Sequence, residues 1–269
     1  MSNVIDLQNQ GESASVWSQL RLEAASAAAT EPTLASMLHA VILNHDNIAD
    51  ALSYILASKI GDANLNQMQV REVCSNAFSA KSQIMQQVEA DAIAVQTRDP
   101  AAKGYLQPFL FFKGFQALQA YRVAHYLWKE GRETLAHHFQ SRISELFGVD
   151  IHPAAIIGQG IMIDHATSIV IGATAVVGND VSMLHSVTLG GTGAEEQDRH
   201  PKIGTGVLIG AGAKVLGNIK IGDFARVAAG SVVLQAVPPR CTVAGVPAKP
   251  VGECCPEPAK SMNHVLDTD

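Results

Sequence analysis

Branched apolar residues recur at every sixth position through much of the second half of the chain. The positions in this series are Ile203, Ile209, Val215, Ile221, Val227 and Val233. A helix repeats at about 3.6 residues and a strand at two, so a period of six matches neither element alone. The period is typical of a chain that turns a corner every six residues and directs one side chain inward from each short face. The spacing therefore predicts a parallel β-helix.

A second series in another phase extends this pattern upstream. Its members are Ile157, Ile163, Ile169, Ile171 and Val177. The changes of phase indicate corner adjustments or a loop extruded from a coil. The alternative is a chance cluster in a sandwich rich in valine and isoleucine, but apolar residues alternate along sandwich strands, so the unbroken series disfavours it. A polar stretch near 190–202, GGTGAEEQDRHPK, interrupts the repeat and predicts an extruded surface loop, a kind of segment that often carries function.

The first half of the chain has a helical pattern instead. Apolar residues between 34 and 42 fall on one helical stripe. Further helices are expected at about 47–59, 67–79 and 81–95, then through 111–125 and 135–146. We expect a helical domain over residues 1–148, a β-helix over 149–250 and a flexible tail over 251–269.

Composition narrows the class of protein. A chain of 269 residues can form two domains, and a net charge of -6 argues against a nucleic-acid surface. No apolar run reaches the roughly 18 residues of a membrane span, and the N-terminal sequence has no secretory pattern. The four cysteines, Cys74, Cys241, Cys254 and Cys255, lack zinc-type spacing. The adjacent pair could be a redox or metal site, but plain thiols in a cytoplasmic protein fit a polar tail better.

One histidine and one carboxylate are spaced for acid–base chemistry. Asp150 precedes His165 by 15 residues, close to one coil of about 18, so stacking is expected to bring them together. A carboxylate against one imidazole nitrogen fixes the tautomer and makes the other nitrogen a better base. The ordinary histidine pKa of about 6.5 suits proton abstraction at neutral pH. The alternative is that both side chains only satisfy hydrogen bonds at a coil edge.

The extruded loop supplies a second group of polar residues. The guanidinium of Arg199 is suited to bind a carboxylate through two N–H groups, and His200 lies next to it in the sequence. The alternative, which is commoner for charged loop residues, is that these side chains are only solvated. His152 and His185 could be inward-facing polar plugs. Three histidines on a β-helix could also bind zinc between subunits, and that alternative stays open. No phosphate-binding Walker loop is present.

Several motifs together resemble those of bacterial serine O-acetyltransferases. They are DIHP at 150–153, IDHA at 163–166, HSVTLGGTG at 185–193, DRHP at 198–201 and AGVPAK at 244–249. The resemblance implies an α+β fold, a helical N-terminal domain followed by a left-handed parallel β-helix. It implies transfer of acetyl from acetyl-CoA to the hydroxyl of L-serine, the first step of cysteine biosynthesis, without a metal. It also implies trimers that pair into hexamers, and inhibition by L-cysteine in the serine site.

The same resemblance suggests a role for each candidate residue. His165 is expected to be the general base and Asp150 its orienting partner. The amino group of serine is expected to contact Asp99 and Asp164, and its carboxylate Arg199 and His200. Acetyl-CoA is expected to lie between neighbouring subunits and to contact Gly191, Thr192, Ala211 and Ala229.

One departure concerns a partner enzyme. Many relatives end in an isoleucine that inserts into O-acetylserine sulfhydrylase, whereas this sequence ends VLDTD with Asp269 last. Formation of that complex is therefore doubtful. The alternative functions are acetylation of a sugar or a drug, a β-helix zinc lyase and a non-catalytic scaffold. A sugar or drug acceptor lacks the charge pair that Asp164 and Arg199 would hold.

Overall fold

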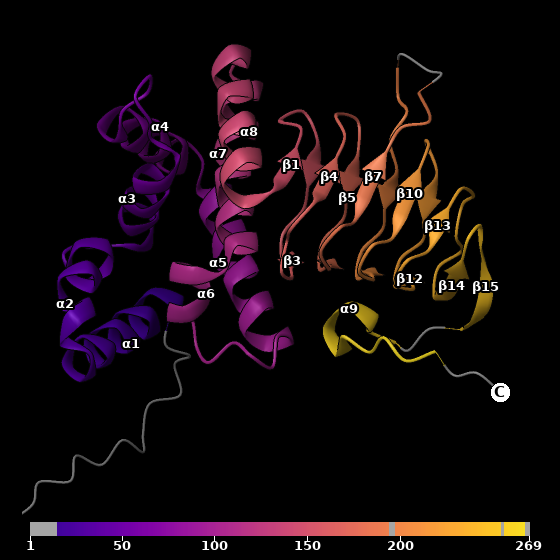
Figure 1. The fold of residues 1–269 in the computed structure, drawn as a ribbon, viewed down its shortest axis with the longest axis horizontal. Coiled ribbons are helices and arrows are strands. Elements are labelled where there is room, and N and C mark those ends of the chain that lie inside the picture. Colours follow the sequence, from indigo (N-terminus) through magenta and orange to yellow (C-terminus); the bar gives the residue numbers. More distant parts are fainter. Residues whose placement is uncertain (1–14, 194–196, 254–255, 267–269) are drawn as a thin grey trace, which may run out of the picture.

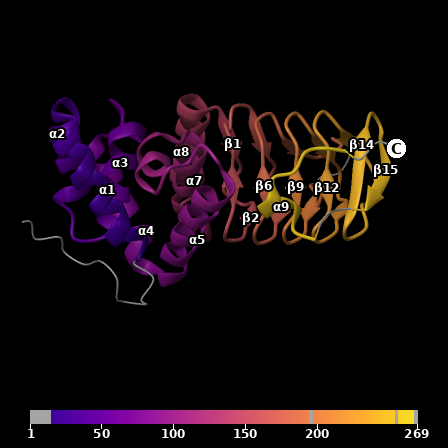
Figure 2. The same ribbon diagram turned by 90° about the horizontal axis from the view of Figure 1, so that it is seen from below.

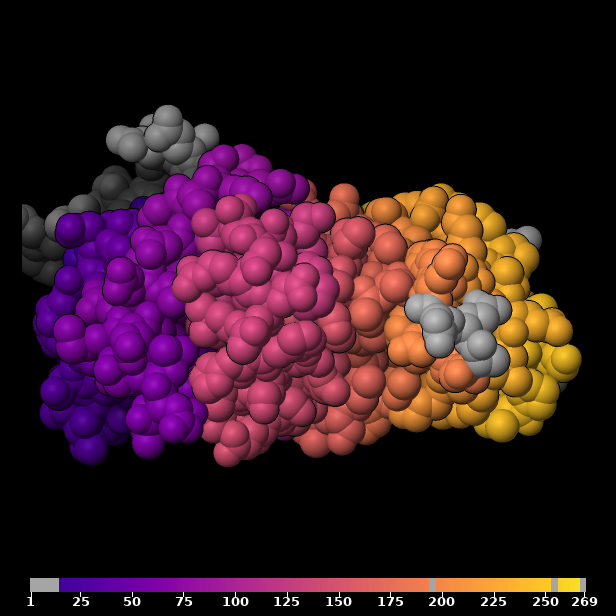
Figure 3. Space-filling view, turned by 90° about the horizontal axis from the view of Figure 1, so that it is seen from above, coloured from indigo at the N-terminus to yellow at the C-terminus, as the bar shows by residue number. Residues whose placement is uncertain are grey.

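The computed structural model describes residues 15–193, 197–253 and 256–266 (Figure 1). The N-terminal segment, the Cys254–Cys255 pair and Asp269 lie outside the described residues. The molecule is elongated, with helices at one end and a parallel β-helix at the other (Figures 1 and 2). The two halves meet over a continuous surface in the space-filling view (Figure 3). This arrangement confirms the predicted fold class.

In the helical half, α5, α7 and α8 contact the first strands of the β-helix. The bounds are α1 Val16–Thr30, α2 Pro32–Leu38, the π-helix η1 His39–Leu43, α3 Ile48–Ile60, α4 Gln67–Ala80, α5 Ser82–Arg98, α6 Leu106–Phe111, α7 Lys113–Lys129 and α8 Glu133–Phe147. Side-chain caps begin several of them: Asn47 accepts from the backbone N–H of Asp50, and Asn66 forms a capping box with Gln69. Gly148 ends α8 in the left-handed conformation at φ 66°. None of the described helices combines the length and the apolarity that crossing a bilayer requires.

The β-helix consists of three sheets that run along its length. The strands are β1 Val149–Ile151, β2 Ile156–Ile157, β3 Met162–Ile163, β4 Ile169–Ile171, β5 Val176–Val177, β6 Ser182–Met183, β7 Thr188–Gly190, β8 Lys202–Ile203, β9 Leu208–Ile209, β10 Lys214–Leu216, β11 Lys220–Ile221, β12 Arg226–Val227, β13 Val232–Val233, β14 Cys241–Gly245 and β15 Ala248–Glu253. Sheet A has the order β1-β4-β7-β10-β13, sheet B β11-β8-β5-β2 and sheet C β15-β14-β12-β9-β6-β3. The chain therefore passes from sheet A to B to C in each coil.

The inward-facing series from Ile203 to Val233 is buried at every position, with 0–2% of each residue exposed. The phase changes have two separate origins. Ile151 pairs with Ile171, a coil of 20 residues, whereas Ile171 pairs with Leu189, a coil of 18. The extra residues of the first coil lie in the corner after Ile163. Leu189 then pairs with Val215, a coil of 26 that contains the extruded loop. Both expected causes, a corner adjustment and an extruded loop, are thus present.

Helices α5 and α7 cover the open end of the β-helix. Arg98 donates to the carbonyl of Gly160 at 2.9 Å, and Arg122 to that of Gly158 at 2.8 Å. Tyr121 donates to the carbonyl of Ala155 at 2.5 Å. These bonds satisfy backbone acceptors that have no preceding coil to pair with.

A buried ion pair holds this contact together. Arg122 donates twice to Asp91 Oδ2, at 2.9 and 2.6 Å, and Asp91 Oδ1 accepts from the backbone N–H of Ile161 at 2.9 Å. Burial raises the pKa of Asp91, and the nearby Arg122 together with donors from Ile161 and Gln119 opposes that rise. The pair therefore links α5, α7 and the first coil.

The segment after residue 250 differs from the expected flexible tail. Strand β15 pairs antiparallel with β14, and the short helix α9, Pro258–Ser261, lies beside α5 and β9 (Figure 2). Ser182 donates to the carbonyl of Ala259 at 2.8 Å, and Arg226 donates to the carbonyl of Val265 at 2.9 Å. The buried Ser182 and Arg226 need these acceptors. Residues 256–266 therefore pack against α5 and the β-helix.

Replacing Arg122 with methionine should lower the free energy of unfolding by about 3–5 kcal/mol, because the carboxylate of Asp91 stays buried without its partner. Denaturant unfolding at pH 7.5 measures the change. Lys260→Ala removes the exposed pair with Glu257 and should cost less than about 1 kcal/mol. Equal effects of the two substitutions would contradict the structural importance of the buried pair.

Candidate active site

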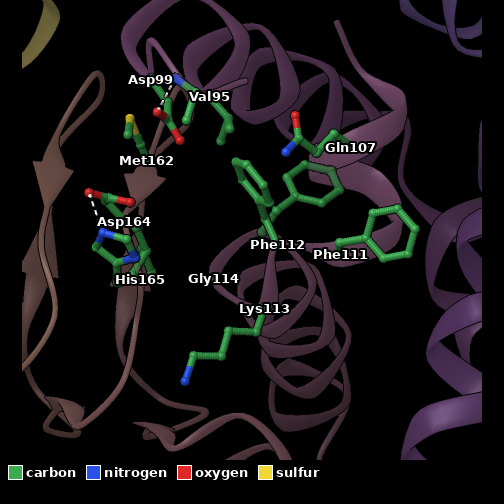
Figure 4. A pocket seen from close by; sticks show the side chains of 13 residues that line it. Val95, Asp99, Gln107, Phe111, Phe112, Lys113, Gly114, Met162, Asp164 and His165 are labelled. Atoms are coloured by element: carbon green, nitrogen blue, oxygen red, sulfur yellow. Dashed lines mark hydrogen bonds and ion pairs between the residues drawn. The ribbon is translucent and has the colours of Figure 1, made fainter. Parts of the chain in front are cut away.

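A cavity of about 470 Å³ lies where the helical domain meets the corner after β3 (Figure 4). Asp164 and His165 come from that corner, and Asp99 comes from the C-terminal end of α5. Phe111, at the end of α6, and Phe112, which follows it, lie on the opposite side. The cavity thus combines two carboxylates and an imidazole with an aromatic wall.

The corner that carries His165 has an unusual backbone. His165, Ala166 and Ser168 have φ of 56, 58 and 64°, in the left-handed region that residues other than glycine rarely adopt. The longer first coil provides the residues for this turn. Such strain is retained where the surroundings fix it, and it is commonly found at functional sites.

Helix α7 holds this corner in place through close backbone contact. A Cβ atom on Gly114 would lie 2.0 Å from the carbonyl oxygen of Ile163, so only glycine permits the approach. Lys113 beside it donates to Thr167 Oγ1 at 2.5 Å. The first turn of α7 and the corner are therefore packed as one unit.

His165 is accessible and lies beside two other polar groups. Its Nε2 is 3.7 Å from Asp164 Oδ2, and 74% of its side chain is exposed. Its ring centroid is 5.9 Å from that of His185 in an edge-on arrangement. An exposed imidazole at the mouth of a cavity is suited to accept a proton from a bound hydroxyl.

Asp150 is in a different part of the same coil. It lies on sheet A, paired with Val170, and its Oδ1 accepts a 2.7 Å hydrogen bond from Gln140. Within one chain the described residues form no ion pair between Asp150 and His165. The expected contact between these two side chains is therefore not made within a single protomer.

Arg199 and His200 lie at the other edge of sheet A, where the chain turns toward sheet B. Thr174 organises this corner: its Oγ1 accepts from the backbone N–H of Arg199 at 3.1 Å and lies 2.8 Å from His200 Nδ1. The backbone N–H of Thr174 also donates to His200 Nδ1 at 3.3 Å, which fixes that nitrogen as the unprotonated one. Burial, followed by Arg199 and Lys202, lowers the pKa of His200. His200 is therefore a neutral donor through Nε2 at neutral pH.

The predicted acetyl-CoA contacts are divided between the same two edges. Ala211 follows His185 along one corner, since Gly212 donates to the carbonyl of His185 at 2.9 Å. Ala229 comes one coil later, where Gly230 donates to the carbonyl of Ala211 at 2.7 Å. Gly191 and Thr192 follow β7 at the other edge, beside Arg199. Ala211 and Ala229 thus lie on successive coils beyond His185, on the same side of the β-helix as His165.

Sequence reasoning missed part of this site. Gln107, Phe112, Lys113 and Gly114 all line the cavity. The sequence signal for this part was the aromatic and glycine run FLFFKGF, which is equally typical of a segment in the hydrophobic core. Among the described residues, no group of three histidine, cysteine or acidic side chains has a geometry that could hold a metal ion.

The fold and this site define a class of acyltransferases built on hexapeptide repeats. The family model "Bacterial transferase hexapeptide (six repeats)" matches residues 200–235, and the model "Serine acetyltransferase, N-terminal" matches residues 16–120. The serine acetyltransferase of Escherichia coli K12 is 55% identical over 238 residues, 88% of this chain and 87% of the relative. The crystal structure of the Vibrio cholerae serine acetyltransferase has a TM-score of 0.93 at 54% identity, covering 94% of this chain and 98% of that chain. The chain belongs to the serine acetyltransferase family and is an acyltransferase.

Three related structures contain ligands. A serine acetyltransferase complex with cysteine is 50% identical, with a TM-score of 0.91 over 93% of this chain and 98% of that one. The Neisseria gonorrhoeae enzyme in complex with serine is 51% identical, with a TM-score of 0.87, and the match covers 90% of this chain and 100% of that one. The Brucella abortus enzyme in complex with coenzyme A is 46% identical, with a TM-score of 0.87, and the match covers 89% of this chain and 96% of that one. Acetyl-CoA is the co-substrate of this family of enzymes.

Replacing Gly172 with alanine should displace the His200 ring, because a Cβ there would lie 1.9 Å from His200 Nε2. We expect serine-dependent release of CoA to fall by about 10- to 100-fold, since small misplacements of a binding group are costly. Release of the CoA thiol measures the rate. Ala173→Gly, at the next residue, should change it little. Full activity of Gly172→Ala at an unchanged melting temperature would contradict a role for His200.

Proposed function

We propose that the protein transfers the acetyl group of acetyl-CoA to the hydroxyl of L-serine, forming O-acetyl-L-serine and CoA, the first step of cysteine biosynthesis. The observation that carries this proposal is the cavity in which an exposed imidazole faces two carboxylates. An amino acid has a cationic amino group that such carboxylates can hold. A sugar or a drug acceptor has no such group as a rule.

The reaction needs one base and no covalent acyl-enzyme. His165 accepts the proton of the serine hydroxyl as its oxygen attacks the thioester carbonyl carbon. The tetrahedral intermediate then collapses, the carbon–sulfur bond breaks, and the CoA thiolate leaves. His165 returns its proton to that sulfur, so the side chain is regenerated. Asp99 and Asp164 hold the ammonium group of serine, and Arg199 and His200 hold its carboxylate.

We further propose that each site is completed by two protomers. Asp164 and His165 lie at the corner through which the chain enters sheet A, beside Asp99 at the end of α5. Asp150 lies within sheet A on β1, and Arg199 and His200 lie at the corner through which the chain leaves sheet A for sheet B. Trimers formed through the β-helix would bring one edge of a protomer against the other edge of its neighbour. The exposure of His165 in the single chain supports this arrangement. Asp150 would then orient the imidazole of an adjacent protomer.

The remaining proposals concern inhibition, assembly and location. Cysteine carries the same ammonium and carboxylate groups as serine, so we propose that it inhibits by occupying the serine site. We propose that trimers pair into hexamers through the helical domains. Cys74 and Cys241 are both free thiols, which supports a cytoplasmic location.

Replacing His165 with alanine should lower serine-dependent release of CoA by at least about 100-fold, because the general base is lost. The thiol assay with serine, homoserine and a sugar measures both the rate and the choice of acceptor. His39→Ala, an exposed histidine of the helical domain, is the matched control. A His165→Ala enzyme as active as the parent would remove the base from this mechanism.

Mixing two variants of strongly reduced activity should raise the activity if protomers share sites. Random trimers of His165→Ala and Asp150→Asn chains contain some sites with both intact residues, about one quarter of the total for equal amounts. Refolding or co-expressing the two differently tagged chains and assaying the purified mixture measures the recovery. Each variant treated alone in the same way is the control. No recovery in verified mixed trimers would mean that both residues act within one chain.

A further inference from the structure

Gln140 of α8 contacts the carboxylate proposed to orient the base. Its Nε2 donates to Asp150 Oδ1 at 2.7 Å, and both residues are half-buried. No other hydrogen bond to the Asp150 carboxylate exists among the described residues. A donor to an ionised acceptor makes one of the stronger hydrogen bonds in proteins. The contact therefore fixes the plane of the carboxylate.

The surrounding contacts settle which way the Gln140 amide points. An ionised carboxylate only accepts, so the NH₂ group must face Asp150 and the amide oxygen must face away. That oxygen lies 3.1 Å from His137 Nδ1, one turn earlier on α8. His137 must then carry its proton on Nδ1, and it donates to Gln140 Oε1. The order of donation is His137 to Gln140 to Asp150.

An aromatic cluster supports the first member of this chain. The ring centroid of His137 is 5.4 Å from that of Trp128 and 5.3 Å from that of His152, both in edge-on arrangements. Trp128 and His152 are themselves 5.3 Å apart. His152 follows β1, so the cluster joins α7 and α8 to the strand that carries Asp150. The amide is held from both sides.

We propose that Gln140 is a positioning residue for the transfer reaction. It donates to Oδ1 of Asp150 and leaves Oδ2, to which no described residue donates, for the imidazole of the adjacent protomer. This inference rests on the proposed function, in which Asp150 orients His165. A carboxylate with one oxygen fixed presents the other at a defined angle, which lowers the reorganisation needed in each turnover.

The test compares Gln140→Leu and Gln140→Glu with Ser141→Leu, an exposed neighbour on α8. Leucine removes the donor at similar size, and glutamate replaces the donor with an acceptor. We expect kcat to fall about 10-fold in both, with KM for serine and acetyl-CoA unchanged, because a charge-assisted hydrogen bond is lost. Ser141→Leu should match the parent. Melting temperatures and solution mass verify that each variant folds and assembles.

A double-mutant cycle separates positioning from a structural effect. In an Asp150→Asn background, Gln140→Leu should cause no further loss of kcat, because the group it positions is gone. An equal loss in both backgrounds would overturn the proposal, and so would unchanged kcat in both Gln140 variants. If Asp150→Asn alone keeps the parental kcat, the role of Asp150 itself fails, and that result identifies the proposed function as the source of the error.

Discussion

The open end of the β-helix is the constraint on which the remaining structure depends. Every later coil satisfies its backbone groups with the coil before it, but the first coil has no predecessor. The carbonyls of Pro153, Ala155, Gly158 and Gly160 would be left without donors, at a cost of about 1–3 kcal/mol each when buried. Side chains of α5 and α7 supply those donors, from Arg98, Tyr121, Arg122 and His125. The Asp91–Arg122 pair aligns the two helices so that this is possible.

The helices α5 and α7, which cover the open end of the β-helix, also form part of the cavity wall. Because Arg98 is bonded to the first coil, the next residue, Asp99, is fixed where α5 ends beside the corner that carries Asp164. Gly114 brings the start of α7 against the carbonyl of Ile163. A function that needs carboxylates from a helix end and an imidazole from a coil corner is thereby obtained from a contact that stabilises the fold. For this reason, substitutions where α5 and α7 contact the first coil are expected to change the effects of substitutions in the cavity.

The sequence predicted the fold well because one inward residue per face gives a period that no other architecture produces. It also identified Asp99, Asp164 and His165, which the cavity brings together. It could not predict how Asp150 lies relative to His165. The prediction assumed a coil of about 18 residues, whereas the first coil has 20, so Asp150 stacks on Val170, beyond the corner. Two added residues in one corner are invisible to a six-residue period until the pairing is known. The packing of residues 256–266 was missed because its partners, Ser182 and Arg226, are polar groups buried in distant coils.

The division of the charged groups between the two edges of sheet A has an electrostatic consequence. Asp164 lies at one edge, beside Asp99 at the end of α5, and Arg199 lies at the other edge with a neutral His200. Neither edge alone complements an amino acid, because each holds only one end of a zwitterion. In the proposed trimer, two such groups from adjacent protomers would complement it fully, and their opposite charges would also favour the packing that brings them together. Assembly and substrate recognition would then depend on the same set of charges, and a substrate that lacks either charged end would leave half of the proposed site unpaired. The desolvation cost of that unpaired half would make the proposed site selective for an amino acid.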